Sequence, residues 1–284
     1  MSKAIEMIAK PLLEKRYEEL KKEVQEIGQV SSLTIIVGNR PDSEMYVNMK
    51  HKKCLELGIE SRIETIPTTA TTEEVLAILR SAVASNMYDG ILIQLPLPKH
   101  IDQELVLERF GDYILTETHN RVLMDVDALS YVGKRCVVPC TPKGIMTLMK
   151  EYKVDLLGKH VVVLGRSEIV GKPVARLCQE EDATVSVIHT RTPEGLKTKL
   201  LTSADVIISC AGSLSCVGYK HLVNNENKPY LIDAGVSFVD GKPIGDIDEE
   251  CREFATGYTP YTGAVGPMTI LSLMENILES AKNR

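Results

Sequence analysis

The chain has 284 residues, of which 44 % are hydrophobic and 25 % are charged, and this length suggests two globular domains rather than one. Its net charge of -6 at pH 7 argues against a nucleic-acid partner, because binding phosphates requires clustered Lys and Arg. No apolar run approaches the roughly 18–20 residues that span a bilayer. The N-terminal stretch up to Val24 mixes charges with apolar positions at helical spacing, which predicts a surface helix of a cytosolic protein rather than a secretory signal.

The cysteines and histidines form no recognisable ligand pattern. Seven cysteines are scattered without a Cys-x-x-Cys pair, and the six histidines show no metal-ligand spacing. An odd number of cysteines in mostly apolar surroundings favours buried free thiols over disulfides or a metal centre. We predict no metal.

From Ser32 onward, short β-branched runs alternate with helical patterns. Thr71 and Glu74 have the spacing of a capping box, and Ser43 is expected to cap the preceding helix. Alternation at this spacing predicts parallel strands joined by helical crossovers, and hence an α/β fold. The expected elements are strands 33–37, 62–66 and 90–95 and helices 43–57 and 71–85.

A second α/β half follows a helix that is expected to begin at Thr141-Pro142, with threonine as the cap and proline in the first turn. No Gly/Ser-rich linker separates the halves, so we expect a packed boundary. Asp240-Gly241 is typical of a tight hairpin turn, and residues 267–282 carry the apolar stripe of a final helix. The expected strands are 160–164, 184–188, 205–209 and 230–233.

The segment Gly165–Pro173 follows the first strand of the second half. A strand, a glycine turn and a helix start are what a dinucleotide pyrophosphate requires, because backbone N–H groups then point at the anion. The spacing departs from Gly-x-Gly-x-x-Gly, since Ser167 replaces the middle glycine and Gly171 comes one residue late. A plain strand-to-helix turn therefore remains an alternative.

The second strand of this half ends without a carboxylate, the residue that binds the ribose hydroxyls in NAD-specific folds. Arg166 and Arg191 could instead reach a 2′-phosphate, which favours NADP, although two solvated arginines are the alternative. Asp233-Ala-Gly235 and Gly245-Asp246 also fall at strand ends or turns, where we favour ordinary turn chemistry.

Tyr46 and Lys50 lie four residues apart on the expected helix 43–57, and therefore on one face. Such a pair usually lies on a solvent-exposed helix face without a function. Gln94, however, stands at the carboxyl end of an apolar strand, where α/β sheets bind ligands. Asp127 is a further candidate, with a turn or cap as its alternative.

Six motifs occur along the chain in this order: Ser43-x-x-Tyr46-x-x-x-Lys50, Asp89-Gly-Ile-Leu-Ile-Gln94-Leu-Pro-Leu-Pro98, Asp125-Val-Asp127, Pro139-Cys-Thr-Pro142, Gly165-Arg-Ser-x-Ile-Val-Gly-Lys-Pro173 and Val265-Gly-Pro-Met-Thr269. The chain thereby resembles the bifunctional methylenetetrahydrofolate dehydrogenase/methenyltetrahydrofolate cyclohydrolase family over nearly its whole length. The resemblance implies an N-terminal α/β catalytic domain, residues 1–142, completed by a C-terminal helix, 267–284. It also implies a Rossmann-like NADP-binding domain, residues 143–266, with a cleft between the domains, and a homodimer.

The resemblance also implies a role for each motif residue. Lys50 would be the catalytic lysine, held and tuned by Gln94, while Tyr46 would pack over the folate and Asp127 would hydrogen-bond the pterin. The further substrate contacts, in a loop lining the cleft, are Gly263 and Pro267. The residues implied around NADP are Gly165, Arg166, Ser167, Ile169, Gly171, Thr190 and Arg191.

The implied activity has two steps. The first oxidises 5,10-methylenetetrahydrofolate with NADP, and the second hydrolyses the methenyl product to 10-formyltetrahydrofolate. Hydride departure from the methylene carbon moves no proton, so this step needs mainly positioning. Hydrolysis does move protons, and a partly desolvated lysine can shuttle them.

Three departures from the family pattern affect the expected folate contacts. Met124 and Ala128 flank the Asp-Val-Asp motif in place of Lys and Gly, the stretch from Asp127 to Pro139 is shorter than usual, and residues 259–265 differ from Thr-Pro-Val-Pro-Gly-Gly-Val. We therefore expect a more open folate site. The alternatives are a monofunctional NAD(P)-dependent dehydrogenase of the same family, a two-domain dehydrogenase of another metabolite as in shikimate-type enzymes, and a non-catalytic folate- or nucleotide-binding protein.

Overall fold

The computed structural model describes residues 3–117, 123–124, 138–239 and 242–283, which form two compact units. We name each unit after the sheet that its described strands form. The four-stranded unit comprises residues 14–139 and 270–284, and the six-stranded unit comprises residues 1–13 and 140–269. Within the described ranges, no helix is both long and apolar enough to cross a membrane.

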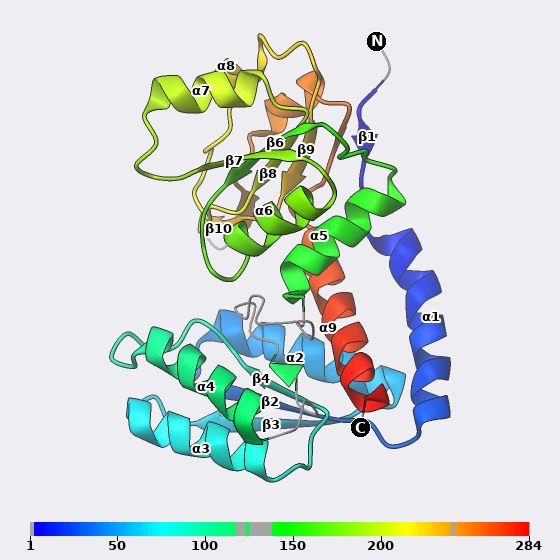
Figure 1. Cartoon of the computed structure of the whole chain (residues 1–284), viewed down its shortest axis with the longest axis vertical. Helices are drawn as coiled ribbons and strands as arrows, with labels where there is room; N and C mark the ends of the chain where they lie inside the picture. Colours follow the sequence, from blue (N-terminus) through cyan, green and yellow to red (C-terminus); the bar gives the residue numbers. More distant parts are fainter. Residues whose placement is uncertain (1–2, 118–122, 125–137, 240–241, 284) are drawn as a thin grey trace. The chain divides into compact units, whose positions relative to one another are not determined.

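The four-stranded unit alternates strands and helices, as the sequence predicts (Figure 1). Its sheet has the order β3-β2-β4-β5, and every pairing in it is parallel. The elements are β2 (Ser31–Val37), α2 (Pro41–Leu57), β3 (Glu60–Ile66), α3 (Thr72–Ala84), β4 (Gly90–Ile93), α4 (Gln103–Glu117) and β5 (Leu123–Met124), with α1 (Lys10–Ile27) before them and α9 (Val265–Lys282) after them in the chain.

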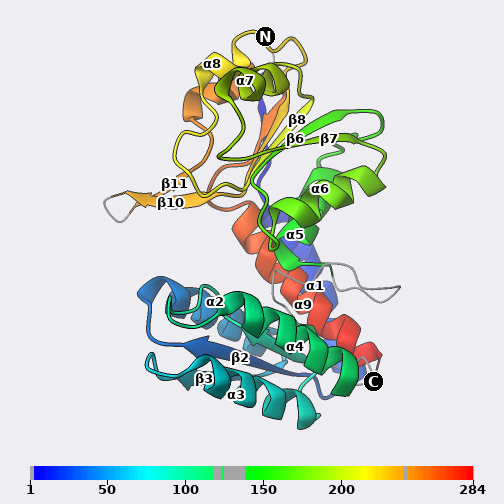
Figure 2. The ribbon, with the colours of Figure 1, turned by 60° about the vertical axis from the view of Figure 1, so that its left-hand side comes forward.

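The two faces of this sheet differ in character. Leu33, Ile35 and Val37 of β2 pack into one apolar core with residues of α3 and α4. Side chains alternate across a strand, so Ser32 and Thr34 lie on the opposite face, which α2 and α9 cover. Figures 1 and 2 show α2 and α3 on opposite sides of the sheet. The polar residues of β2 therefore face the helix that carries Tyr46 and Lys50.

The six-stranded unit has a parallel sheet in the order β1-β12-β9-β8-β6-β7. Helices cover both faces: α5 and α6 contribute to one apolar core, and α7, α8 and η1 to the other. The hairpin β10–β11 stands out from the sheet (Figure 2). The elements are β1 (Ile5–Glu6), α5 (Cys140–Glu151), β6 (His160–Leu164), α6 (Gly171–Glu180), β7 (Thr184–Ile188), α7 (Glu194–Thr202), β8 (Val206–Ser209), α8 (Tyr219–Leu222), β9 (Tyr230–Asp233), β10 (Val236–Val239), β11 (Lys242–Gly245), η1 (Glu249–Phe254) and β12 (Gly257–Tyr258).

The N-terminus differs from the sequence prediction. Helix α1 begins only at Lys10, and the residues before it form the short edge strand β1. Ile5 donates its backbone N–H to Thr256 O at 2.9 Å, and Met7 donates to Tyr258 O at 2.8 Å. These bonds place residues 1–13 in the six-stranded unit, whereas the expected boundary put them in the N-terminal domain. The helical spacing of the apolar residues was a poor guide there, because Met7 packs into the core of the six-stranded unit while Ile5 and Ile8 are exposed.

The sequence predicts the start of α3 correctly and the start of α2 incorrectly. The Thr71 capping box is confirmed: Glu74 N–H donates to Thr71 Oγ1 at 3.2 Å, and Thr71 N–H donates to Glu74 Oε2 at 2.8 Å. Ser43 is not the cap of α2, since the helix begins at Pro41 with Arg40 in the capping position. Proline pre-sets the helical φ at the first position, so α2 starts earlier than the serine suggests. The expected turn at residues 240–241 lies outside the described residues, but the strands on either side of it pair antiparallel.

Candidate active site and nucleotide-binding turn

Helix α2 places Lys50 at the edge of its buried face. Val47 and Cys54 on that face are 2 % and 3 % exposed, while the Lys50 side chain is half-buried. Tyr46, one turn earlier, is 38 % exposed. The two residues thus lie on adjacent turns of one helix, as their spacing predicts, with the phenol ring open to solvent and the lysine partly sheltered.

Gln94 follows β4 and meets Lys50. Its backbone N–H donates to Ile35 O at 2.8 Å, which holds the residue against β2 one position beyond the end of the strand. In its side chain, Nε2 donates to Leu95 O at 2.7 Å, and Oε1 accepts from Lys50 Nζ at 3.4 Å. The bond to Leu95 O fixes which end of the amide faces the lysine. The structure therefore brings together two of the residues that the sequence analysis grouped.

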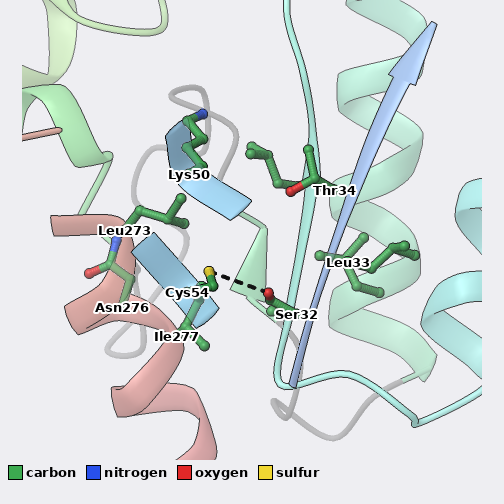
Figure 3. Close-up of a pocket in the computed structure, with 11 residues that line it drawn as sticks. Ser32, Leu33, Thr34, Lys50, Cys54, Leu273, Asn276 and Ile277 are labelled. Carbon is green, nitrogen blue, oxygen red and sulfur yellow. Dashed lines mark hydrogen bonds between the residues drawn. The ribbon is translucent and has the colours of Figure 1, made fainter. Parts of the chain in front are cut away.

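A pocket opens beside Lys50, on the face of the sheet covered by α2 and α9 (Figure 3). Most of its lining is apolar, and Leu273 and Ile277 reach it from α9. The polar lining that sequence reasoning missed consists of Ser32 and Thr34 of β2, Cys54 of α2 and Asn276 of α9. One signal was available: Ser32 and Thr34 alternate with the apolar Leu33 and Ile35, which indicates a strand face that meets something polar.

Cys54 is an inert member of this lining. Burial raises the pKa of its thiol, and hydrogen bonding to Ser32 and the charge of Lys50 oppose that shift only partly. Its Sγ lies 3.7 Å from Ser32 Oγ and 3.6 Å from Met274 Sδ. A protonated thiol among such partners fills space and does not act as a nucleophile.

Asp127, the expected pterin ligand, lies outside the described residues. Gly263 and Pro267, the expected substrate contacts of the loop, lie within the described residues, and both belong to the six-stranded unit. Gly263 has φ +81° and its carbonyl accepts from Ala9 N–H at 3.0 Å. Pro267 is already in the first turn of α9, two residues after the helix begins at Val265. The expected loop of residues 263–269 is thus mostly helical.

In the six-stranded unit, the segment after β6 is a tight turn that requires glycine at two positions. Gly165 has φ +115°, and a Cβ atom there would lie 2.8 Å from Cys210 O. A Cβ atom on Gly171 would lie 2.4 Å from Gly165 O. Ser167 stabilises the turn between them, because its Oγ accepts from Val170 N–H at 3.1 Å. Both glycines are therefore required for the turn that leads from β6 into the first turn of α6.

The expected cofactor residues lie at one edge of the sheet. Strands β6 and β7 are parallel neighbours, and Gly165 N–H donates to Ile188 O at 2.9 Å, so the segments that follow both strands start side by side. Arg166, Thr190 and Arg191 have exposed side chains there, and neither guanidinium has an ion-pair partner among the described residues. The side chain of Ile169 is half-buried in the turn.

Two buried aspartates organise the same edge. Asp246, which is 0 % exposed, accepts at Oδ2 from Ser209 Oγ and Ala211 N–H, each at 2.8 Å, and at Oδ1 from Ser213 N–H at 2.8 Å. Asp233 accepts from Asp246 N–H at 3.1 Å, and burial raises its pKa to about 6. The carboxylates shape the loop after β8, which agrees with the turn chemistry favoured from sequence.

Family models match both halves of the chain. The catalytic domain of tetrahydrofolate dehydrogenase/cyclohydrolase matches residues 7–111, and the NAD(P)-binding domain of the same family matches residues 139–284.

Individual members of this family match the chain over almost its whole length. A bifunctional protein FolD of Halalkalibacterium halodurans is 38 % identical over 98 % of this chain and 99 % of its own. A crystal structure of the bifunctional enzyme FolD from Campylobacter jejuni is 34 % identical, covers 98 % of both chains and superposes with a TM-score of 0.85. The Trypanosoma brucei FolD structure, complexed with NADP cofactor and an inhibitor, is 29 % identical with a TM-score of 0.85, and covers 100 % of this chain and 99 % of its own.

Proposed function

The chain belongs to the tetrahydrofolate dehydrogenase/cyclohydrolase family, and we propose that it performs both reactions of that family at a site built around Lys50 and Gln94. It oxidises 5,10-methylenetetrahydrofolate to the methenyl form with NADP, and hydrolyses the methenyl form to 10-formyltetrahydrofolate. The enzyme is thus an oxidoreductase and a hydrolase of one-carbon metabolism. The contact between Lys50 Nζ and Gln94 Oε1 carries the assignment of the site.

The turn after β6 fits the cofactor. A Cβ atom at Gly165 or Gly171 would collide with backbone atoms, so both glycines are required for the tight turn that leads into α6, and the first N–H groups of that helix suit a pyrophosphate. The residues that would hold NADP are Gly165, Arg166, Ser167, Ile169, Gly171, Thr190 and Arg191. When bound, NADP accepts the hydride from the substrate. No carboxylate follows β7 to bind a free ribose hydroxyl, and the two arginines suit a 2′-phosphate.

The oxidation requires positioning more than proton transfer. A ring-nitrogen lone pair drives the hydride from the methylene carbon, so no side chain needs to remove a proton in this step. Tyr46 presents an exposed ring on which the flat folate can pack. Gln94, Asp127, Gly263 and Pro267 complete the proposed substrate contacts.

The hydrolysis requires a group that moves protons. Water attacks the methenyl carbon, a C–O bond forms, and the amine of Lys50 takes a proton from the attacking water. The bond from that carbon to one ring nitrogen then breaks, and the nitrogen takes a proton from the lysine. The hydroxyl loses its remaining proton to solvent as the formyl C=O bond forms, so one proton is released overall, which balances the charge of the methenyl cation. Gln94 Oε1 accepts from Nζ and so orients the amine for both transfers.

Replacing Lys50 by methionine tests this division of labour. Lys50→Met keeps the length of the side chain and removes the amine, so hydrolysis should fall roughly 10²–10⁴-fold, the usual worth of a positioned acid/base group. Dehydrogenase activity should fall much less, and methenyl product should accumulate in an absorbance assay. Lys52→Met, at an exposed position of the same helix, is the matched control and should change neither rate.

Two results would contradict the assignment. If both activities collapse together while circular dichroism shows an intact fold, Lys50 binds substrate and does not move protons. If neither activity changes, Lys50 is a surface lysine.

We further propose that the enzyme works in the cytosol as a homodimer, as its resemblance to the family implies. Light scattering on the purified protein should then give twice the 31.4 kDa mass of the chain, and fractionation of cells should recover the activity in the cytosol.

A further inference from the structure

Thr34 has a buried hydroxyl without a hydrogen-bond partner among the described residues. The residue lies in the middle of β2, paired to Ile63 on one side and Leu92 on the other, and it is 6 % exposed. Sheet pairing occupies its backbone but not its side chain. Buried polar side-chain atoms nearly always have a partner in the protein or in ordered water, so an exception requires an explanation.

The neighbouring hydroxyl on the same face is accounted for. Ser32 Oγ lies 3.7 Å from Cys54 Sγ and 3.4 Å from Glu60 O. Both residues line the pocket beside Lys50, and Figure 3 shows them along one edge of it. The unmet hydrogen bond is therefore specific to Thr34 and is not a general property of this face.

Lys50 brings unmet donors to the same pocket. As the free amine that accepts a proton in the hydrolysis, Nζ carries two N–H donors, and within the described chain only Gln94 Oε1 accepts one of them, at 3.4 Å. Most of the remaining lining is apolar, and the side chain of Asn276 already donates to Val138 O at 3.0 Å. One mostly apolar pocket thus contains a lysine and a threonine that both need hydrogen-bond partners.

We propose that an ordered water bridges Lys50 Nζ and Thr34 Oγ1, and that Thr34 is thereby a positioning residue for the hydrolysis. The water accepts an N–H from Lys50 and donates to the threonine hydroxyl oxygen, which gives each group one further hydrogen bond. The inference rests on the proposed function of Lys50. It adds that β2, through Thr34, helps to aim the amine.

The geometry of the Lys50 amine explains why the bridging water would raise the rate of hydrolysis. Nζ has three positions besides its bond to Cε. Gln94 takes one and the bridging water takes the second, so the third is left for the proton that hydrolysis moves. Without the water, the amine rotates among positions and presents the productive one less often. The hydride step moves no proton and does not depend on this aim.

The test compares two Thr34 variants with a matched control. Thr34→Val keeps the shape and removes the hydroxyl, and we expect hydrolysis kcat to fall roughly tenfold, the effect of one hydrogen bond. KM for the methenyl substrate and the dehydrogenase rate should change less than about twofold, and the pH profile of hydrolysis kcat should shift. Thr34→Ser should restore most of the rate. Thr65→Val, at an exposed position of the neighbouring strand β3 outside the pocket lining, should leave both activities unchanged.

Crystallography of the unaltered enzyme gives a second readout that does not depend on any variant folding. Density for a water between Lys50 Nζ and Thr34 Oγ1 is expected, and its absence at high resolution overturns the proposal. Equal losses of both activities in Thr34→Val, or no loss of hydrolysis, also overturn it and leave Thr34 a structural residue. If Lys50→Met abolishes hydrolysis while Thr34→Val does not, only this inference fails. If Lys50→Met leaves hydrolysis intact, the proposed function fails first.

Discussion

The carbonyl oxygen of Gly165 lies 2.4 Å from the position that a Cβ atom on Gly171 would occupy. The two ends of the turn that we propose to bind the nucleotide therefore meet through backbone atoms alone. A side chain at residue 171 would have to displace Gly165 and the Cα of Arg166, which are the atoms expected to meet the cofactor. The glycine is required by the turn itself, independently of any ligand.

Gly171→Ala should weaken NADP binding at least about tenfold and destabilise the protein by about 1–3 kcal/mol, as overpacking does elsewhere. Fluorescence titration with NADPH and urea unfolding would measure the two effects. Gly195→Ala is the matched control, since nothing lies within 4 Å of an added Cβ atom there and alanine favours a helix. Unchanged cofactor affinity in Gly171→Ala would show that the turn does not bind NADP.

Replacing Arg166 and Arg191 together by glutamine should weaken NADP binding and leave NAD binding nearly unchanged. Each charge-assisted hydrogen bond to a 2′-phosphate contributes about 1.5–3 kcal/mol, and NAD lacks that phosphate. Titration of each variant with both cofactors measures the difference. Arg176→Gln, an exposed arginine of α6 that pairs with Glu180, is the control. Equal losses for the two cofactors would place the arginines elsewhere than at the phosphate.

Asp246→Ala should destabilise the six-stranded unit by about 2–4 kcal/mol, because it leaves several buried N–H and O–H donors without an acceptor. The loop after β8, residues 210–213, depends on this carboxylate for its conformation. Chemical denaturation followed by circular dichroism would measure the loss, with Glu250→Ala at an exposed position as the control. A variant as stable as the parent would mean that water replaces the carboxylate without cost.

His221 should make stability depend on pH. Burial lowers the pKa of its imidazole below 6.5, and the ring is held neutral, with Nδ1 accepting from Gly218 N–H at 3.0 Å and Nε2 3.1 Å from Glu194 Oε1. The unfolded chain therefore binds a proton more readily, and the stability that this residue contributes above pH 6.5 is lost as the pH falls below it. The free energy of unfolding measured from pH 7.5 to 5 should fall less steeply in His221→Gln. Parallel curves for the two proteins would contradict the assignment.

The sequence predicts the regularly alternating strands and helices of this fold better than the elements that interrupt the alternation. Strands β7 and β9 have the expected bounds, because β-branched runs with clear turn residues define them locally. Strand β1 could not be predicted, since two residues pair only because β12 is there to receive them. Helix α4 is not among the elements expected from the sequence, because Pro96 and Pro98 follow β4 and are typical of a chain that leaves regular structure.

The same distinction holds for the site. The spacing of Tyr46 and Lys50 predicts a shared helix, and the position of Gln94 after a strand predicts the edge of the sheet. The contact between Lys50 and Gln94, however, depends on how α2 packs on the sheet that contains β2 and β4, and the sequence does not give that packing. Thr34 and Asp246 look unremarkable in the sequence, since what distinguishes them is burial and the number of partners that the folded chain gives them.

The path of the chain through the two units has a consequence for its synthesis. Helix α9 contributes Leu273, Met274 and Ile277 to the face of the four-stranded sheet, and it follows all the described strands of that sheet in the chain. Until residues 270–282 are made, the part of this face that α9 covers therefore has no partner, and only α2 lies over the sheet on that side. A chain that stops before residue 270 would contain every described strand of both sheets, but its four-stranded unit would lack the α9 residues that pack on the sheet.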